Sequence, residues 1–123
     1  MSRTPDSPLM DRWRDLYRRV ARRNGAEPDA GRHLYRWLKT TGFTEITMSA
    51  SCQVMADEES RRNWGESWAE RCLTTDFASQ AVAYGYATEA ELGEIAADWR
   101  GWANDPDGYF HYICDEGLAV RTT

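Results

Sequence analysis

The sequence predicts an α+β chain that is mainly helical and carries one antiparallel pair of strands. Two observations lead to this fold class. Helical spacing of apolar residues covers most of the chain, and only the segments 43–53 and 109–121 have strand-like patterns, far apart in the sequence. Because a lone strand pair is marginally stable in water, we expect residues 1–123 to be a single partial domain belonging to a larger α/β unit.

The first predicted helix covers residues 7–25. Ser7 is suited to its N-cap and Pro8 to its first turn, and Asn24-Gly25 should end it. Its apolar stripe consists of Leu9, Trp13, Leu16, Tyr17 and Val20.

A second helix is predicted over 28–42, with Gly42 as its C-terminal cap. Its expected buried residues are Leu34, Trp37 and Leu38.

The segment 43–53 is predicted to be an edge strand, because apolar and polar residues alternate from Thr44 to Cys52. The second strand-like segment, 109–121, is predicted to be a final strand and tail. Residues 109–114 are apolar on both faces, which indicates a central strand, and 115–117 are expected to form a turn.

The residues between these strands, 57–104, are predicted to be a helical insert. Asp57, Thr75 and Thr88 are suited to cap its successive helices, and Thr88 with Glu91 matches a capping box. The apolar positions at helical spacing are Trp64, Trp68 and Cys72 in the first helix and Leu92, Ile95, Trp99 and Trp102 in the last. A turn at 105–108 should separate the insert from the final strand.

The formal net charge is −5, which argues against nucleic acid or an anionic membrane as the main partner. Seven arginines nevertheless fall within 3–23; a solvated helix face is the simpler explanation, and phosphate binding is the alternative. The sequence has no apolar run long enough to cross a bilayer and no signal-like start, so we expect a cytoplasmic protein. Its three widely spaced cysteines do not indicate a disulfide framework or a zinc site.

Several stretches, in order, resemble a known family: "GRHLYRWLKTTGFTEITMSAS", "ADEESRRNWGESWAERC" and "DFASQAVAYGYATEAELGEIAADWRGWANDPDGYF". They look like the C-terminal part of actinobacterial class I methyltransferases of the ubiquinone-biosynthesis-like group, which use S-adenosylmethionine. The resemblance implies a Rossmann-like sheet whose sixth strand lies at the edge and whose antiparallel seventh strand is inserted beside it. Residues 43–53 would be the edge strand, and 109–113 the inserted one.

The cofactor-binding half of that family has no counterpart here, since the nine glycines include no Gly-x-Gly pair. We therefore expect no cofactor in this chain alone and S-adenosylmethionine only in a complete enzyme. No residue is assigned a catalytic or metal-binding role.

The resemblance implies that this chain contributes walls of the methyl-acceptor pocket. The candidate substrate-binding residues are Trp13, Tyr17, Trp64, Trp68 and Arg71. Their aromatic members lie on apolar helix stripes, so burial in a core is the competing explanation. Arg32 and Arg71 would bind an acceptor carboxylate or pair with nearby Asp and Glu residues.

Two functions follow. In the first, the chain is the acceptor-side portion of a small-molecule methyltransferase, completed by a separate cofactor-binding chain or by the missing half. In the second, it is a stand-alone, non-catalytic ligand-binding or dimerisation module, and burial of its strand pair would make it a homo-oligomer.

Overall fold

The computed structural model describes residues 1–121 and confirms the predicted α+β class: these residues form five α-helices, one 3-10 helix and a three-stranded antiparallel sheet. In chain order the elements are β1 (Ser2–Thr4), α1 (Pro8–Arg23), η1 (Ala30–His33), α2 (Leu34–Thr40), β2 (Phe43–Met55), α3 (Glu58–Thr74), α4 (Asp76–Ala83), α5 (Glu89–Ala103) and β3 (Tyr109–Arg121). The last two residues of the expected domain lie outside the described part.

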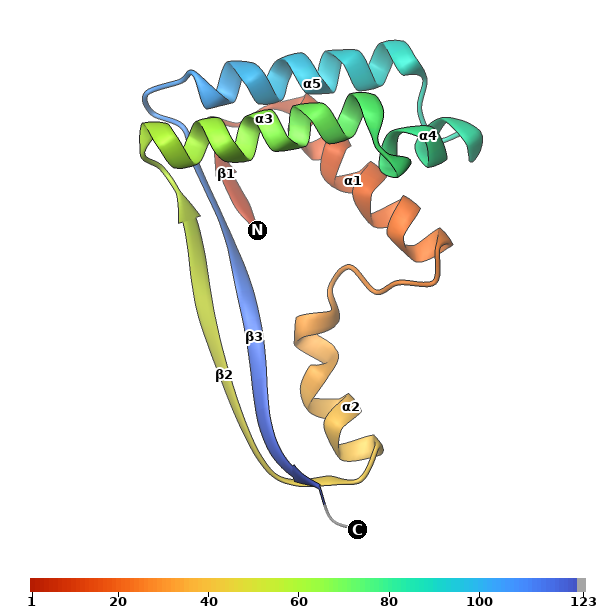
Figure 1. Ribbon diagram of the computed structural model, residues 1–123, viewed down its shortest axis with the longest axis vertical. Helices are drawn as coiled ribbons and strands as arrows, with labels where there is room; N and C mark the ends of the chain where they lie inside the picture. The colour runs from red at the N-terminus through yellow and green to blue at the C-terminus, as the bar shows by residue number, and fades with distance from the viewer. Residues whose placement is uncertain (122–123) are drawn as a thin grey trace.

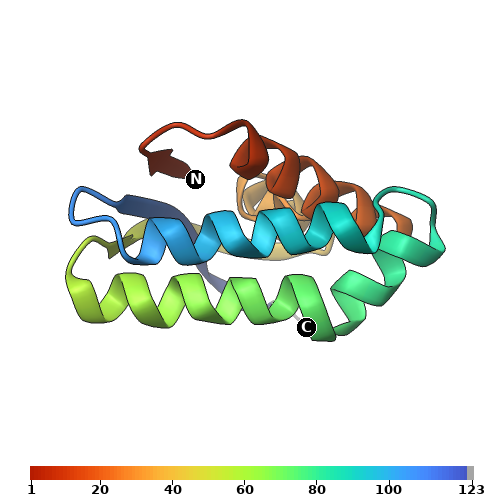
Figure 2. The same ribbon diagram turned by 90° about the horizontal axis from the view of Figure 1, so that it is seen from above.

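One end of the molecule consists of α1, α3, α4 and α5, which together form the helical body, and the long ribbon of β2 and β3 extends away from them (Figure 1). α3 and α5 lie side by side, and α1 crosses them obliquely (Figure 2). α2 stands apart from this helical body and packs on the lower half of the ribbon (Figure 1). The ribbon therefore meets the helical body only at its upper end.

The core lies between α1, α3, α5 and the upper end of the ribbon. Trp99 at its centre is fully buried, and Phe110 brings β3 into contact with it at a ring-centroid distance of 5.7 Å. The four apolar residues that the sequence predicted along α5, from Leu92 to Trp102, are each 2% exposed or less, so that prediction is confirmed.

The strand order is β1–β3–β2, which places β2 at an edge of the described sheet and β3 at its centre, as predicted. The prediction that there is no third strand is wrong, because Ser2–Thr4 pairs with β3 opposite 109–111. Beyond His111, no strand of the described chain pairs with that side of β3. Ten residues of the central strand, 112–121, thus have one open edge.

The predicted turn at 115–117 is also wrong, because β3 continues through it. Asp115, Glu116 and Gly117 pair with Ala50, Ser49 and Met48 of β2 in an unbroken ladder. The ladder supplies hydrogen bonds that outweigh the local turn preference of these residues. Gly117 also leaves room for α2, since a Cβ there would lie 2.6 Å from Leu38 Cδ1.

The second predicted helix is shorter than expected. Within 28–42 the structure has the 3-10 helix η1 and the short helix α2, and neither helix has a fully buried residue. Trp37, predicted to be buried, is 40% exposed, because α2 contacts the ribbon and not the helical body. Gly42 adopts a φ of 93°, the left-handed conformation expected of a C-terminal cap.

The helix caps differ partly from prediction. Asp57 caps α3 by accepting from the Ser60 backbone N–H at 2.8 Å, as predicted. Ser7 does not cap α1 with its side chain, because its hydroxyl donates to Asp98 on α5 at 2.8 Å. The Thr75 hydroxyl likewise donates to the Arg71 carbonyl at 2.7 Å and leaves α4 without a side-chain cap.

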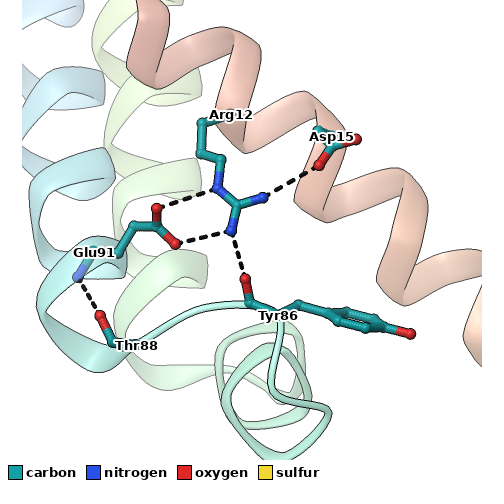
Figure 3. Close-up of polar contacts among 5 residues, drawn as sticks. All are labelled: Arg12, Asp15, Tyr86, Thr88 and Glu91. Carbon is teal, nitrogen blue, oxygen red and sulfur yellow. Dashed lines mark hydrogen bonds and ion pairs between the residues drawn. The ribbon is translucent and has the colours of Figure 1, made fainter.

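The capping box at the start of α5 is half formed (Figure 3). The Thr88 hydroxyl accepts from the Glu91 N–H at 3.1 Å. The Glu91 carboxylate does not return to Thr88; it accepts two hydrogen bonds from Arg12 of α1, each 3.1 Å long. Arg12 also donates to the Tyr86 carbonyl and to Asp15. A bidentate, charge-assisted contact has thus replaced the local backbone contact and joins α1 to α5.

No helix among residues 1–121 has the length and apolar character needed to span a bilayer.

Candidate functional site

A cavity of about 520 Å³ lies where α1, α3, the segment before α2 and the upper part of β3 meet. Its aromatic lining consists of Trp13, Tyr17, Trp64, Trp68, Phe110 and Tyr112. Its charged lining consists of Arg18, Asp29, Arg32, Arg71 and Asp115. The structure therefore brings all five sequence-predicted site residues to one cavity.

Helical spacing explains why α3 contributes three of these residues. Trp64, Trp68 and Arg71 are separated by four and three positions, which places them on one side of the helix. Trp13 and Tyr17 of α1 share a face for the same reason, and the two faces meet: Trp13 and Trp68 have ring centroids 4.7 Å apart in an edge-to-face arrangement. The cavity therefore depends on the packing of α1 against α3.

The predicted residues differ in how far they are buried. Trp13 and Trp68 are 3% and 7% exposed and belong to the core, so they form the floor of the cavity. Tyr17 and Trp64 are partly buried and pack against that core, whereas Arg71 is exposed. Trp13 and Trp68 are thus core residues that also line the cavity, and the wall that a ligand can reach consists mainly of Tyr17, Trp64 and Arg71.

The aromatic part of the wall continues onto β3, which the site prediction missed. Tyr112 stacks on Trp64 with ring centroids 5.3 Å apart and an angle of 18° between the planes. Phe110 lies 5.4 Å from Trp64 and closes the inner end. The only sequence signal for these residues is the apolar run 109–114, which predicts a buried strand and does not indicate which helices cover it.

The arginines of the cavity have different partners. Arg18 pairs with Asp29 at 3.3 Å, and Arg22 reaches the same carboxylate at 3.2 Å. Arg71 lies over the Trp68 ring, with its Cζ 4.6 Å from the centroid. Within residues 1–121, neither Arg71 nor Arg32 forms an ion pair, so the surface salt-bridge explanation for these two arginines is wrong.

The other arginines of α1 are engaged outside the cavity. Arg12 and Arg14 contact carboxylates, and Arg19 and Arg23 lie over the rings of Tyr86 and Tyr84. These arginines are therefore engaged by side chains of the same chain.

A second hollow, of about 620 Å³, lies between the end of α3, α4 and the start of α5. None of its lining residues is aromatic or basic, and its two charged side chains are Asp76 and Glu89. It contains none of the predicted site residues. Cys72 borders it from the core, where burial raises the pKa of the thiol to about 12. A thiol with so high a pKa stays protonated near neutral pH and is a poor nucleophile. Cys72 therefore does not make this hollow a candidate catalytic site.

In the fold that the sequence resembles, S-adenosylmethionine requires a glycine-rich turn between a strand and a helix N-terminus. In the described residues, 5–7 join β1 to α1 and 56–57 join β2 to α3, and neither junction contains glycine. The N-terminus of α3 is already occupied by the Asp57 carboxylate. These residues do not fit the cofactor.

Within the same part of the chain, no group of three or more His, Cys, Asp or Glu side chains is placed to hold a metal ion. Comparison with protein-family models, with curated protein sequences and with solved structures found no match to this chain.

Proposed function

We propose that this chain forms the acceptor-binding part of a small-molecule methyltransferase and that a polypeptide segment outside this sequence holds S-adenosylmethionine. The observation that carries the proposal is the convergence of α1 and α3 on one aromatic cavity. The family resemblance assigns acceptor-pocket residues to those same two helices. The role of the chain would be to bind and orient the acceptor, because positioning supplies much of the rate enhancement in transfer between two bound molecules.

The sheet gives the proposal a second support. β2 is an edge strand, and β3 is antiparallel to it and central, which is the arrangement that the resemblance implies for the last two strands. The open edge of β3 from Tyr112 onward has free backbone groups to which further strands can pair. A cofactor-binding half would add its sheet at this edge.

The proposal is tested first by titrating S-adenosylmethionine into the isolated chain in a calorimeter. We expect no heat of binding, because neither strand-to-helix junction fits the cofactor. Measurable binding by this chain alone would contradict the proposal that the cofactor is held elsewhere.

A second test is reconstitution. The chain is co-expressed with the polypeptide encoded immediately upstream, and transfer of a labelled methyl group to extracted small molecules is measured with each part alone and with both. We expect transfer only with both parts, and less transfer when Trp64→Ala removes the accessible wall. Arg62→Gln is the matched control, since Arg62 lies on the same helix and pairs with Glu58 outside the cavity. Full activity of the upstream polypeptide alone would overturn the proposal.

A stand-alone ligand-binding or dimerisation module is the second candidate function. It is favoured by the fact that the cavity is formed entirely by this chain and by the exposed apolar side chains of the ribbon, among them Leu118 at 78% exposure and Ile113 at 59%. A dimer of defined mass in sedimentation equilibrium, together with failure of the reconstitution, would favour this second function over the first.

A further inference from the structure

We propose that the cavity takes a planar, largely apolar molecule that bears one anionic substituent and that Arg32 and Arg71 recognise the anion. This inference rests on the acceptor pocket proposed above and specifies the chemical class of its ligand.

The shape and chemistry of the wall favour a flat ring system. Trp64 and Tyr112 form a stacked pair whose planes differ by 18°, and Tyr17 meets Trp68 edge to face at 5.6 Å. Flat aromatic surfaces at these angles offer both offset-stacked and edge contacts to a further ring. A volume of about 520 Å³ falls within the range of small-molecule sites.

The charges around this wall favour an anion. Three arginines and two aspartates line the cavity, so positive charge is in excess. Asp29 is already engaged by Arg18 and Arg22, which neutralises that side of the opening. Arg32 and Arg71 are exposed and without an ion-pair partner in the described chain.

Arg71 is also held in a defined place. Its guanidinium stacks on Trp68, and this cation–π contact leaves the N–H groups at its rim free to donate. A planar guanidinium fork matches a carboxylate or a phosphate with two hydrogen bonds. An anionic substituent at the opening and a ring against Trp64 would therefore be bound together.

The remaining polar groups of the cavity are mainly donors. The hydroxyl groups of Tyr17 and Tyr112 make no hydrogen bond within residues 1–121. The indole N–H groups of Trp13, Trp64 and Trp68 also lack acceptors, but they are closed off from solvent and therefore from a ligand. Two hydroxyls, two guanidiniums and the Asp115 carboxylate are left. The donors outnumber this one acceptor group, which suits a ligand with acceptor oxygens.

The test compares four probes that share one ring system: 2-naphthoate, 2-naphthyl phosphate, the neutral 2-naphthalenemethanol and the cationic 2-naphthylmethylammonium. Affinity is measured by calorimetry, and the binding place is read from backbone NMR shifts. We expect both anions to bind at the cavity and the cation to bind most weakly; the ratio between the two anions tells whether the site prefers a carboxylate or a phosphate.

Arginine variants assign the contact. Arg71→Gln and Arg32→Gln should each lower the affinity for the better anion by about fivefold, the size expected of a partly exposed charge pair. They should leave the affinity for the neutral alcohol unchanged. Arg36→Gln is the matched control, because Arg36 is also exposed and unpaired in the described chain but does not line the cavity.

The outcomes separate this inference from the proposed function. If the neutral alcohol binds at the cavity as tightly as the anions, the anion specificity is wrong and the acceptor pocket stands. If none of the four probes shifts the resonances of the cavity residues, the proposed ligand class is overturned, whereas the acceptor-binding role is decided by the reconstitution experiment.

Discussion

Gly65 provides a sharp test of how closely α3 and α5 pack. A Cβ added at Gly65 would lie 2.7 Å from the Ala103 Cβ, 3.0 Å from the Trp99 carbonyl oxygen and 3.4 Å from Trp102 Cε3. The first two contacts are shorter than van der Waals separation, and both involve atoms fixed to the α5 backbone. Gly65→Ala can be accommodated only if the two helices move apart.

Two opposing effects set the size of the change. Alanine is favoured over glycine inside a helix by about 1 kcal/mol. Overpacking of a well-packed core typically costs about 1–3 kcal/mol, and here rigid backbone atoms on a neighbouring helix place the cost at the upper end of that range. We therefore expect Gly65→Ala to lower the free energy of unfolding by about 1–2 kcal/mol. For a chain of this length the melting temperature should fall by roughly 4–8 °C.

The assay is urea denaturation followed by far-UV circular dichroism, with the m-value checked for constancy. Gly101→Ala is the matched control, because Gly101 lies on α5, is exposed and has no heavy atom within 4 Å of the added Cβ. This control should raise the free energy of unfolding by about 0.5–1 kcal/mol. If both variants are stabilised alike, the close approach of α3 and α5 is refuted.

Three further predictions concern other parts of the chain. Cys72 should resist iodoacetamide in the folded protein while the exposed Cys52 reacts, and equal labelling rates of the two cysteines would contradict the burial of Cys72. Burial raises the pKa of the Cys72 thiol from 9.0 to about 12. The contribution of this thiol to the free energy of unfolding should therefore be complete below pH 9.0 and decline as the pH rises from 9.0 to about 12. Thr88→Ala should cost about 1 kcal/mol of unfolding free energy in denaturant melts, since its hydroxyl accepts the Glu91 N–H; an unchanged midpoint would show that Arg12 alone holds the start of α5. The wild-type chain should self-associate in sedimentation velocity through its open ribbon, and Leu118→Lys should weaken this association; a monodisperse wild-type monomer would refute that expectation.

Local signals in the sequence located most of the helices and, for α1, α3 and α5, the faces that they bury. Asp57 and Thr88 were recognisable as caps because a cap depends on residues three positions apart. The apolar spacing along α5 predicted its buried side because helix geometry relates near neighbours. The same rule placed Trp64, Trp68 and Arg71 on one side of α3.

Only the tertiary structure decided what those faces meet. Ser2–Thr4 is too short to show a strand pattern and is a strand because it lies beside 109–111. The central strand passes through a turn-like sequence because β2 supplies its hydrogen-bonding partners. Whether an arginine is paired or free depends on carboxylates far away in the chain, as with Arg12 and Glu91, and this leaves Arg71 available at the cavity. Local geometry is encoded over a few residues, whereas these contacts form only when distant segments pack against one another.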